Sequence, residues 1–478
     1  MPELWHFFPI ALALAKPETG HLADVRPAAP QFCSLEALGE WHPLLDRQDP
    51  ISRIEEENGT RLPWLIAERH RRMAESPFAW FRGTAAQMAA DLAPLPRSPH
   101  WVQLCGDAHL LNFGFYASPE RSLVFDINDF DETAPGPFEW DVKRLLVSAV
   151  LVARQWQLDR EEQFRLARKV AAAYRKAMAE YANLPTLKLW NCLLHVERFV
   201  EELPATAFRS HLEVAVAQAL RRSGRQAIQK HCEFLPDGTA QIRHQPPLVW
   251  RHALLDPTAL WASEPDLDPA SIPSHSEAIA FLLAGYRESL PPHRRYQLQD
   301  FALVDTALKA VGVGSVGTRC AIGLMKGPHP EDWLLLQSKQ ALPSCIDQQL
   351  GNEAGHQGQR VVEGQRLIQC VCDPFLGWTS TPKGIPMYWR QLRDWKASVS
   401  LASMKPPSLK AYAKLCASVL ARAHARSGQR QVLHGALGDD KAFDRAMANF
   451  ALGYSDQVEE DHRALLQAMA SGRLTSSD

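Results

Sequence analysis

The segment that most constrains the fold contains two short apolar runs, with polar residues before, between and after them. Asp107 and Asn112 precede the first apolar run, 113–116, and Asp129 follows the second, 123–125. The Ser-Pro-Glu-Arg sequence between the runs is typical of a turn, which predicts a short antiparallel hairpin. Antiparallel pairing places the start of one strand beside the end of the other. We therefore expect Asn112 and Asp129 at the same end of the hairpin, with Asp107 just upstream.

The side chains at that end have the chemistry of a metal and phosphate site. An Asn amide oxygen and a carboxylate are hard ligands that suit Mg²⁺ bound together with phosphate, so Asn112 and Asp129 are the candidate metal ligands. Asp131 is the candidate ligand of a second metal ion, or a residue that supports the first metal's ligands. Asp107 is placed to accept a proton from a hydroxyl group. This layout of loop, hairpin and carboxylate is typical of phosphoryl transfer in protein kinases. The alternative is a set of solvated loop acids and a turn asparagine.

Three motifs carry a resemblance to known families: Gly-Asp-x-His-x-x-Asn at 106–112, Asp-Phe-Asp-Glu at 129–132, and Gly-Pro-x-Glu-Trp-Asp at 136–141. Together they resemble the aminoglycoside phosphotransferase and choline kinase branch of the protein-kinase-like fold. From about Ser76 onward the chain also resembles a bacterial family, domain of unknown function 2252. The phosphotransferase motif usually starts with His, where this chain has Cys105. That His is mainly structural, so the change does not remove the chemistry.

A second glycine-containing segment, with Gly312, Gly314 and Gly317, has two interpretations. Its Gly-x-Gly-x-x-Gly spacing fits a dinucleotide fold if a helix follows directly. Here the continuation alternates like a strand, reaches a turn, and enters a second strand that contains Lys339. Glycine loop, strand, turn and strand with an interior lysine is the nucleotide lobe of a kinase. In that interpretation the glycines cover the phosphates and Lys339 contacts them; the alternative for Lys339 is a surface lysine on a strand.

A kinase lysine is held by a glutamate from a nearby helix. The sequence predicts this helix over 359–371, with Glu363 as the partner of Lys339; Glu353 is the alternative, within a Gly-rich stretch. The strand that begins near Tyr388 would lead to an interlobe hinge where adenine binds. A long amphipathic helix is predicted over 409–425.

These parts occur in an unusual order, because the catalytic loop precedes the nucleotide lobe. The resemblance therefore implies an α+β fold with two kinase-like lobes, circularly permuted between the 409–425 helix and the catalytic loop. The expected units are an N-terminal extension at 1–95, a catalytic-loop and helical part at 96–300, a small lobe at 301–396, and helices returning to the large lobe at 397–478. Two helices are predicted in the last unit, at 443–454 and 457–469.

Composition limits the classes of partner. A formal net charge of −2 does not indicate a general nucleic-acid binder, and nine scattered cysteines do not form a secreted disulfide framework. No apolar run is long enough to span a bilayer. We therefore expect a cytoplasmic protein with no membrane or nucleic-acid partner.

The expected function is an ATP- and Mg²⁺-dependent phosphotransferase acting on an unknown small-molecule or protein acceptor with a hydroxyl group. The alternatives are nucleotidyl (AMP) transfer on the same scaffold, a nucleotide-binding pseudokinase module, and a dinucleotide-dependent oxidoreductase, which a strand after Gly317 would exclude. Arg82, in Trp-Phe-Arg-Gly-Thr, could contact a phosphate or an acidic substrate, but we favour its pairing with a loop acid.

Overall fold

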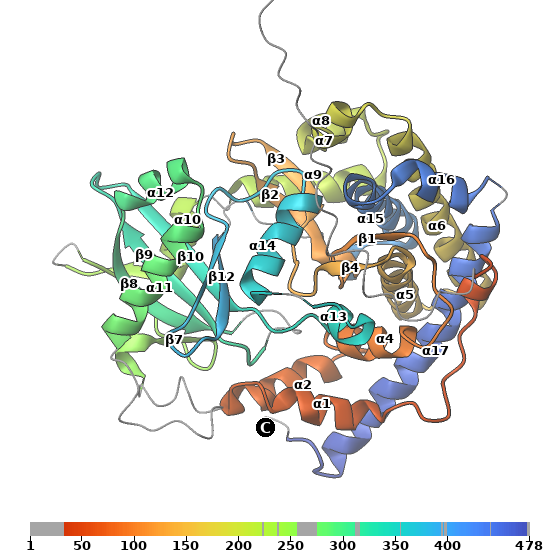
Figure 1. Cartoon of the computed structure of the whole chain (residues 1–478), viewed down its shortest axis with the longest axis horizontal. Coiled ribbons are helices and arrows are strands. Elements are labelled where there is room, and N and C mark those ends of the chain that lie inside the picture. The colour runs from red at the N-terminus through yellow and green to blue at the C-terminus, as the bar shows by residue number, and fades with distance from the viewer. Residues whose placement is uncertain are drawn as a thin grey trace, which may run out of the picture.

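A computed structural model of the chain describes residues 33–221, 224–236, 239–255, 275–310, 316–353, 355–392, 395, 399–439 and 441–475. Helices and strands are mixed along this part of the chain, which gives an α+β protein. Figure 1 shows a β-sheet with its own helices on one side of the molecule and a larger, mainly helical part on the other. The hairpins and α13–α14 lie between them.

The sheet has six antiparallel strands in the order β11-β12-β10-β9-β8-β7. Their bounds are β7 Val249–Arg251, β8 Ala302–Lys309, β9 Cys320–Lys326, β10 Trp333–Gln340, β11 Gly377–Ser380 and β12 Pro386–Gln391. The two strands predicted after the glycines are β9 and β10, and β10 contains Lys339. The predicted helix that follows is α14, Gln357–Ile368, after a short α13, Cys345–Leu350.

Both faces of the sheet are covered, which explains why β10 is buried along most of its length. Side chains alternate across a strand. Leu334 and Leu336 pack with α11 (His275–Ser289) and α12 (Pro292–Gln299), whereas Leu335 packs with α10 (Gly224–His231) and the hairpin of β5 (Cys232–Phe234) and β6 (Ala240–Ile242). The same alternation puts Gln337 and Lys339 on the α10 face.

This packing corrects one predicted boundary. The described residues between 224 and 299 pack on the sheet, and no buried residue from that range belongs to the core of the helical part. The small unit therefore begins near residue 224, and the predicted boundary at 300/301 is wrong. Helix α10 and strand β7 belong to the sheet side because their apolar side chains are buried there.

The larger part is built around long helices. They are α5 Glu139–Gln155, α6 Arg160–Ala182, α15 Pro406–Ser427, α16 Arg430–Leu437 and α17 Ala442–Ala470. Helix α6 begins at a capping box made by Asp159 and Glu162. Helix α15 matches the prediction over 409–425. The two helices predicted at 443–454 and 457–469 form one continuous helix, α17, because its apolar stripe runs on without a break.

Shorter helices complete this part. The N-terminal ones are α1 Pro50–Asn58, α2 Ile66–Ala74, α3 Pro77–Arg82 and α4 Ala85–Leu92, and on the other side lie α7 Thr186–Trp190, α8 Val196–Glu202 and α9 Ala207–Arg221. Met73, Trp80 and Met88 are buried in the main core. The described part of 1–95 is therefore integral to the helical part. No helix in the described ranges is long and apolar enough to cross a membrane.

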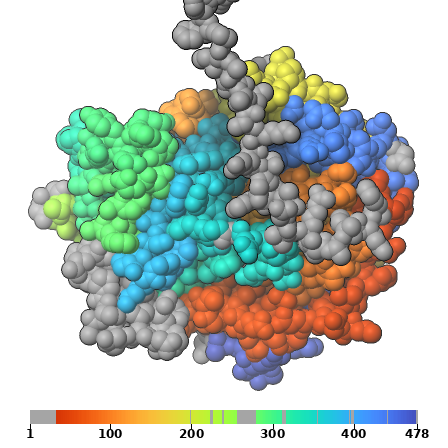
Figure 2. Space-filling view, in the orientation of Figure 1, coloured from red at the N-terminus to blue at the C-terminus, as the bar shows by residue number. Residues whose placement is uncertain are grey.

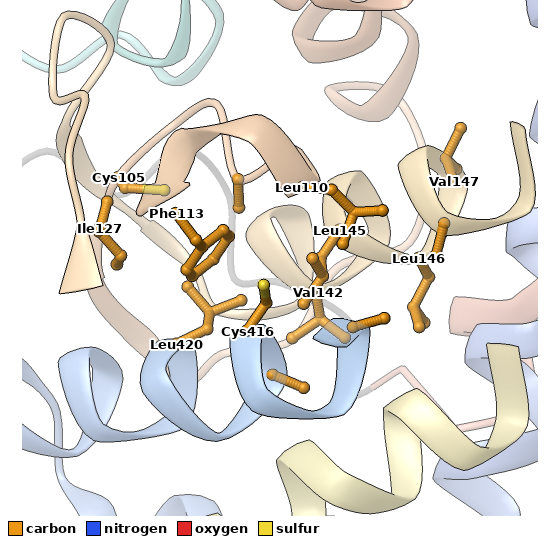
Figure 3. Packing of buried hydrophobic residues seen from close by; sticks show 14 of the residues in the cluster. Cys105, Leu110, Phe113, Ile127, Val142, Leu145, Leu146, Val147, Cys416 and Leu420 are labelled. Carbon is orange, nitrogen blue, oxygen red and sulfur yellow. The ribbon is translucent and has the colours of Figure 1, made fainter. Parts of the chain in front are cut away.

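Two short pairs of antiparallel strands carry the polar motifs. Strand β2 (Phe113–Ala117) pairs with β3 (Leu123–Ile127), and β1 (Trp101–Leu104) pairs with β4 (Ala134–Pro137). The predicted hairpin is thus confirmed. Figure 3 shows Cys105, Phe113 and Ile127 packed above Cys416 and Leu420 of α15. The loop between β1 and β2 consequently rests on an apolar floor supplied by a helix far away in sequence.

The end of α15 lies against β1. The Gln103 amide donates a hydrogen bond of 3.1 Å to the Ser427 hydroxyl. At Gly428 a Cβ would lie 2.7 Å from a methyl carbon of Val102, so this close approach requires glycine. Helix α15 and the start of the loop between β1 and β2 are therefore neighbours in space, although most of the chain separates them in sequence.

A segment after α1 joins the two parts of the molecule. Leu62 and Leu65 pack with Leu308 and Val316 from the sheet side. The Leu62 amide donates to the carbonyl of Gly317 at 2.7 Å, and Arg61 donates to the carbonyl of Val316 at 2.6 Å. Figure 2 shows the face on which the N-terminal helices, in red and orange, adjoin the segment that contains α13 and α14, in teal and cyan.

Candidate active site

A cavity of about 1020 Å³ lies between the sheet and the polar hairpin. Its walls come from both parts of the molecule. The sheet side supplies Lys339 and Arg390, and the hairpin side supplies Asp107, Asn112, Asp129 and Asp131. The structure therefore brings the predicted base, the predicted metal ligands and the predicted phosphate-binding lysine into one cavity.

Asp141 fixes the backbone of the catalytic loop. Its carboxylate accepts hydrogen bonds from the amides of Cys105 at 2.8 Å and Gly106 at 3.0 Å. Nε2 of His424, on α15, lies 3.2 Å from the same carboxylate, and the Tyr174 hydroxyl lies 2.8 Å from Nδ1 of His424. These groups are buried, so the network holds the loop in one conformation. Burial raises the pKa of the Cys105 thiol, which packs as an apolar side chain.

Helix α15 supports the loop at a second point. The Tyr412 hydroxyl lies 3.0 Å from the carbonyl of Leu110 and 3.2 Å from that of Phe113. The two carbonyls flank the short helical turn that carries Asn112. A buried tyrosine with a bonded hydroxyl therefore holds the end of the loop, whereas Asp141 holds its start.

Asp107 is a half-buried carboxylate with two cationic or polar neighbours. Nε of Arg144 donates to its Oδ1 at 2.6 Å, and Nε2 of His109 lies 3.6 Å from its Oδ2. Burial would raise the pKa of Asp107, but the charge and hydrogen bond of Arg144, together with His109 and the more distant charge of Arg82, outweigh it and leave this pKa below its ordinary value. Burial lowers the pKa of His109 to about 3, so the imidazole is neutral. Asp107 is thus an ionised acceptor at neutral pH.

Asn112 and Asp129 lie at one end of the hairpin, as predicted. The Asn128 amide donates to the Asn112 carbonyl at 2.9 Å. Nδ2 of Asn112 donates to the Asp107 carbonyl at 2.8 Å, which leaves Oδ1 as the atom that could ligate a cation. Oδ1 of Asp129 is buried without a hydrogen-bond donor. A buried carboxylate oxygen without a donor suits a cation.

The protein ligands at this point are few. No group of three or more His, Cys, Asp or Glu side chains in the described ranges is arranged to hold a metal ion. One carboxylate and one amide form a minimal set, which fits Mg²⁺ because Mg²⁺ keeps several waters and phosphate oxygens among its ligands.

Lys339 contacts the hairpin side of the cavity. Its ammonium forms an ion pair with Oδ2 of Asp131 and lies 3.9 Å from Oδ1 of Asp129. The Tyr388 hydroxyl, on the neighbouring strand, donates to Oδ1 of Asp131 at 2.5 Å. Burial would lower the pKa of Lys339, but the two carboxylates outweigh it and raise this pKa well above its ordinary value. Burial would raise the pKa of Asp131, but the charge and hydrogen bond of Lys339, with the hydrogen bond of Tyr388, outweigh it and lower this pKa.

The predicted role of Glu363 is wrong. Its side chain is exposed on α14 and accepts a hydrogen bond of 2.7 Å from Gln359, while Lys339 pairs with Asp131. Arg360 is the α14 residue that reaches the site. Its guanidinium donates to the carbonyls of Asp131 at 2.9 Å and Leu342 at 3.0 Å, which fixes the backbone that follows the hairpin.

The predicted glycine loop is described only in part. Gly312 and Gly314 lie outside the described residues. Gly317 has a φ of +91°, and a Cβ there would lie 2.9 Å from Cβ of Arg61. Gly317 is therefore needed for contact with the N-terminal segment, and its neighbour Thr318 lines the cavity. Strand β9 follows directly, so the helix required by a dinucleotide fold is missing and the oxidoreductase hypothesis is excluded.

Comparison with known proteins identifies the family. A family model described as "Uncharacterized protein conserved in bacteria (DUF2252)" matches residues 61–468. The chain belongs to the DUF2252 family. No curated protein and no solved structure matches it. The matched range contains the charged cavity residues described above, from Arg82 to Arg390, together with the supporting helix α15.

Sequence reasoning missed three residues of this DUF2252 site. Arg144, which pairs with Asp107, lies three positions after Asp141, and a charged residue inside the apolar helix α5 was the available sign. Tyr388 is directly opposite Lys339 in the sheet register, so finding it required the strand pairing. Arg390, whose Nε donates to Gln337 at 2.9 Å, needed the same information.

Proposed function

We propose that this DUF2252 protein is an ATP- and Mg²⁺-dependent phosphotransferase that acts on a hydroxyl-bearing acceptor. The observation that carries the proposal is the position of Lys339. It lies 208 positions from Asp131 in sequence, yet the two side chains form an ion pair in the cavity that Asp107 also lines. A lysine, metal-type carboxylates and a separate loop carboxylate in one cavity are the parts that phosphoryl transfer requires.

Each residue has a role that follows from its surroundings. Asp107 accepts the acceptor hydroxyl's proton or orients that hydroxyl, and Arg144 keeps it ionised. Asn112 and Asp129 would hold Mg²⁺, with Asp131 as a further carboxylate. Lys339 would contact nucleotide phosphates after exchanging part of its contact with Asp131. Such a site accelerates the reaction mainly by positioning and charge neutralisation.

The strand order supports a kinase-like interpretation of the sheet. In that interpretation the glycine segment lies between β8 and β9, and the lysine is on β10, the third strand of the series. Helix α14 comes between β10 and β11, where a kinase has the helix that carries its glutamate. The departure is Glu363, which does not contact Lys339.

Circular permutation is part of the proposal. In kinases the helix that precedes the catalytic loop runs directly into it. Here α15 ends against β1 through Ser427 and Gly428, and β1 leads to Asp107. His424 in the last turns of α15 also contacts Asp141. A chain break at this point would change the order of the elements while preserving their neighbours.

The direct test is incubation of the full chain with Mg²⁺ and ATP labelled separately at the α- and γ-phosphates, with a small-molecule bacterial extract as the acceptor source. Transfer or release of the γ label that requires Asp107 supports phosphoryl transfer. Transfer of the α label identifies nucleotidyl transfer instead. Binding of ATP without loss of either label identifies a pseudokinase, and absence of ATP binding removes the proposal.

A further inference from the structure

Arg82 enters the cavity at the end of α3. Ser76 caps this helix by accepting a hydrogen bond from the Ala79 amide at 3.1 Å, and Pro77 takes the first helical position. The side chain of Arg82 lines the cavity together with Asp107 and Asp129. The sequence motif that contains Arg82 therefore ends inside the candidate active site.

The guanidinium of Arg82 is not paired in the way the sequence predicted. Its Nε is buried without a hydrogen-bond partner, and no carboxylate of the described chain lies within salt-bridge distance. Burial lowers the pKa of Arg82, with the more distant charges of Asp107 and Glu75 acting in the opposite direction. The predicted pairing with a loop acid is therefore wrong. A partly buried cation without a hydrogen-bonded partner is costly unless a ligand supplies one.

Other basic residues of the cavity have partners. Lys339 pairs with Asp131, and Nε of Arg390 donates to Gln337. Nε of Arg53 donates to the amide oxygen of Gln87 at 3.0 Å. Arg82 differs from these residues because its buried Nε has no hydrogen-bond partner.

Arg144 links the backbone directly before Arg82 to the proposed base. One guanidinium donates both to Asp107 at 2.6 Å and to the carbonyl of Phe81 at 2.7 Å. It also lies over the ring of Phe81, 4.0 Å from the centroid. At the next position, a Cβ on Gly83 would lie 2.9 Å from the terminal methyl of Met73, so the backbone has little freedom. The position of Arg82 beside Asp107 is thus preorganised.

We propose that Arg82 binds an anionic group of the acceptor, so that the substrate is a hydroxyl compound carrying a phosphate or carboxylate. This inference rests on the proposed phosphotransferase function. A guanidinium binds such oxyanions through a planar fork of donors. Because Arg144 links Asp107 to the backbone directly before Arg82, and both residues line one cavity, an anion held by Arg82 would place the neighbouring hydroxyl near the base. Lys339, on the opposite wall, serves the nucleotide.

The test is calorimetric titration of the full chain with inorganic phosphate, in the presence of Mg²⁺ and a saturating non-hydrolysable ATP analogue. Arg82→Gln should weaken phosphate binding at least roughly tenfold, as expected for loss of a charge-assisted contact. The same variant should leave the affinity for the analogue within about twofold. Arg53→Gln, which alters another cavity arginine, should change neither affinity. Arg82→Lys keeps the charge but not the fork and should recover only part of the phosphate affinity.

A complementary variant separates this inference from the function on which it rests. Lys339→Met should weaken binding of the analogue and leave phosphate binding unchanged. If the wild-type chain binds phosphate through Arg82 but never binds the analogue, the phosphotransferase proposal fails while the anion site stands. Unchanged phosphate affinity in folded Arg82→Gln and Arg82→Lys, or no phosphate binding by the wild type, would overturn the inference. Equal loss of phosphate and analogue binding would assign Arg82 to the nucleotide's phosphates instead.

Discussion

The ion pair between Lys339 and Asp131 joins the two walls of the cavity. Replacing Lys339 and replacing Asp131 should lower the free energy of unfolding by different amounts. The Lys339 side chain is 3% exposed, whereas the Asp131 side chain is 27% exposed. Removing one partner of a fully buried pair costs about 3–5 kcal/mol, because a buried charge is left uncompensated. Lys339→Met leaves a carboxylate that water partly solvates and that Tyr388 still contacts, so we expect a loss of about 2 kcal/mol. Asp131→Asn leaves a buried ammonium with Asp129 at 3.9 Å, so we expect about 3–4 kcal/mol.

The double variant Lys339→Met/Asp131→Asn tests whether these losses arise from uncompensated charge. It removes both charges together, so its loss should be smaller than the sum of the single losses by about 2 kcal/mol or more. The measurement is urea-induced unfolding of the wild type, both single variants and the double variant at neutral pH. Tyr388→Phe is the matched control, because it removes a hydrogen bond to Asp131 but no charge. Additive losses in the cycle, or a larger loss for Lys339→Met than for Asp131→Asn, would refute the argument.

Three further predictions concern the hairpin end of the cavity. Asp107→Asn should leave ATP affinity near that of the wild type and lower turnover by roughly a hundred- to ten-thousand-fold, measured with labelled ATP on a preparation of known melting temperature; retained turnover in the folded variant would remove Asp107 from the mechanism. Asp129→Asn should weaken the Mg²⁺ dependence of ATP binding without unfolding the chain, and calorimetry that shows the same dependence would reject the ligand assignment. His109 is buried with a pKa lowered from 6.5 to about 3, so its contribution to stability is complete above pH 6.5 and is lost as the pH falls towards 3. The stability difference between wild type and His109→Gln should therefore fall by about 1.4 kcal/mol for each pH unit below 6.5, and parallel urea curves near pH 7 and about pH 5 would contradict this.

Local patterns were sufficient to predict the hairpin end of the site. The turn between two apolar runs determines the pairing of β2 with β3, and the pairing alone places Asn112 beside Asp129. Strand alternation likewise predicted β10 around Lys339. These features depend on residues that are close in sequence, so they could be predicted from the sequence alone.

The partners of the charged residues could not be predicted in this way. The sequence offered Glu363 on the correct helix, but the rotation of α14 points Arg360 at the site and turns Glu363 to solvent. Helix rotation depends on the packing of both its faces, which no local pattern specifies. The favoured pairing of Arg82 with a loop acid was wrong for a related reason. An isolated arginine near acidic residues is expected to form an ion pair with one of them. Only the tertiary structure shows that Arg144, and not Arg82, forms the ion pair with Asp107.

The support that α15 gives to the catalytic loop has a consequence for how the protein is made. Tyr412 and the Leu110 carbonyl it contacts are 302 positions apart, and His424 contacts Asp141 across 283 positions. At ribosomal rates of roughly 5–20 residues per second, the loop leaves the ribosome about 15–60 seconds before its supporting helix exists. During that interval the loop lacks the hydroxyl of Tyr412, the imidazole of His424 and its apolar floor. The nascent chain therefore carries an unfinished candidate active site until synthesis has passed α15, and any ribosome stall before that helix yields a product in which this site is incomplete.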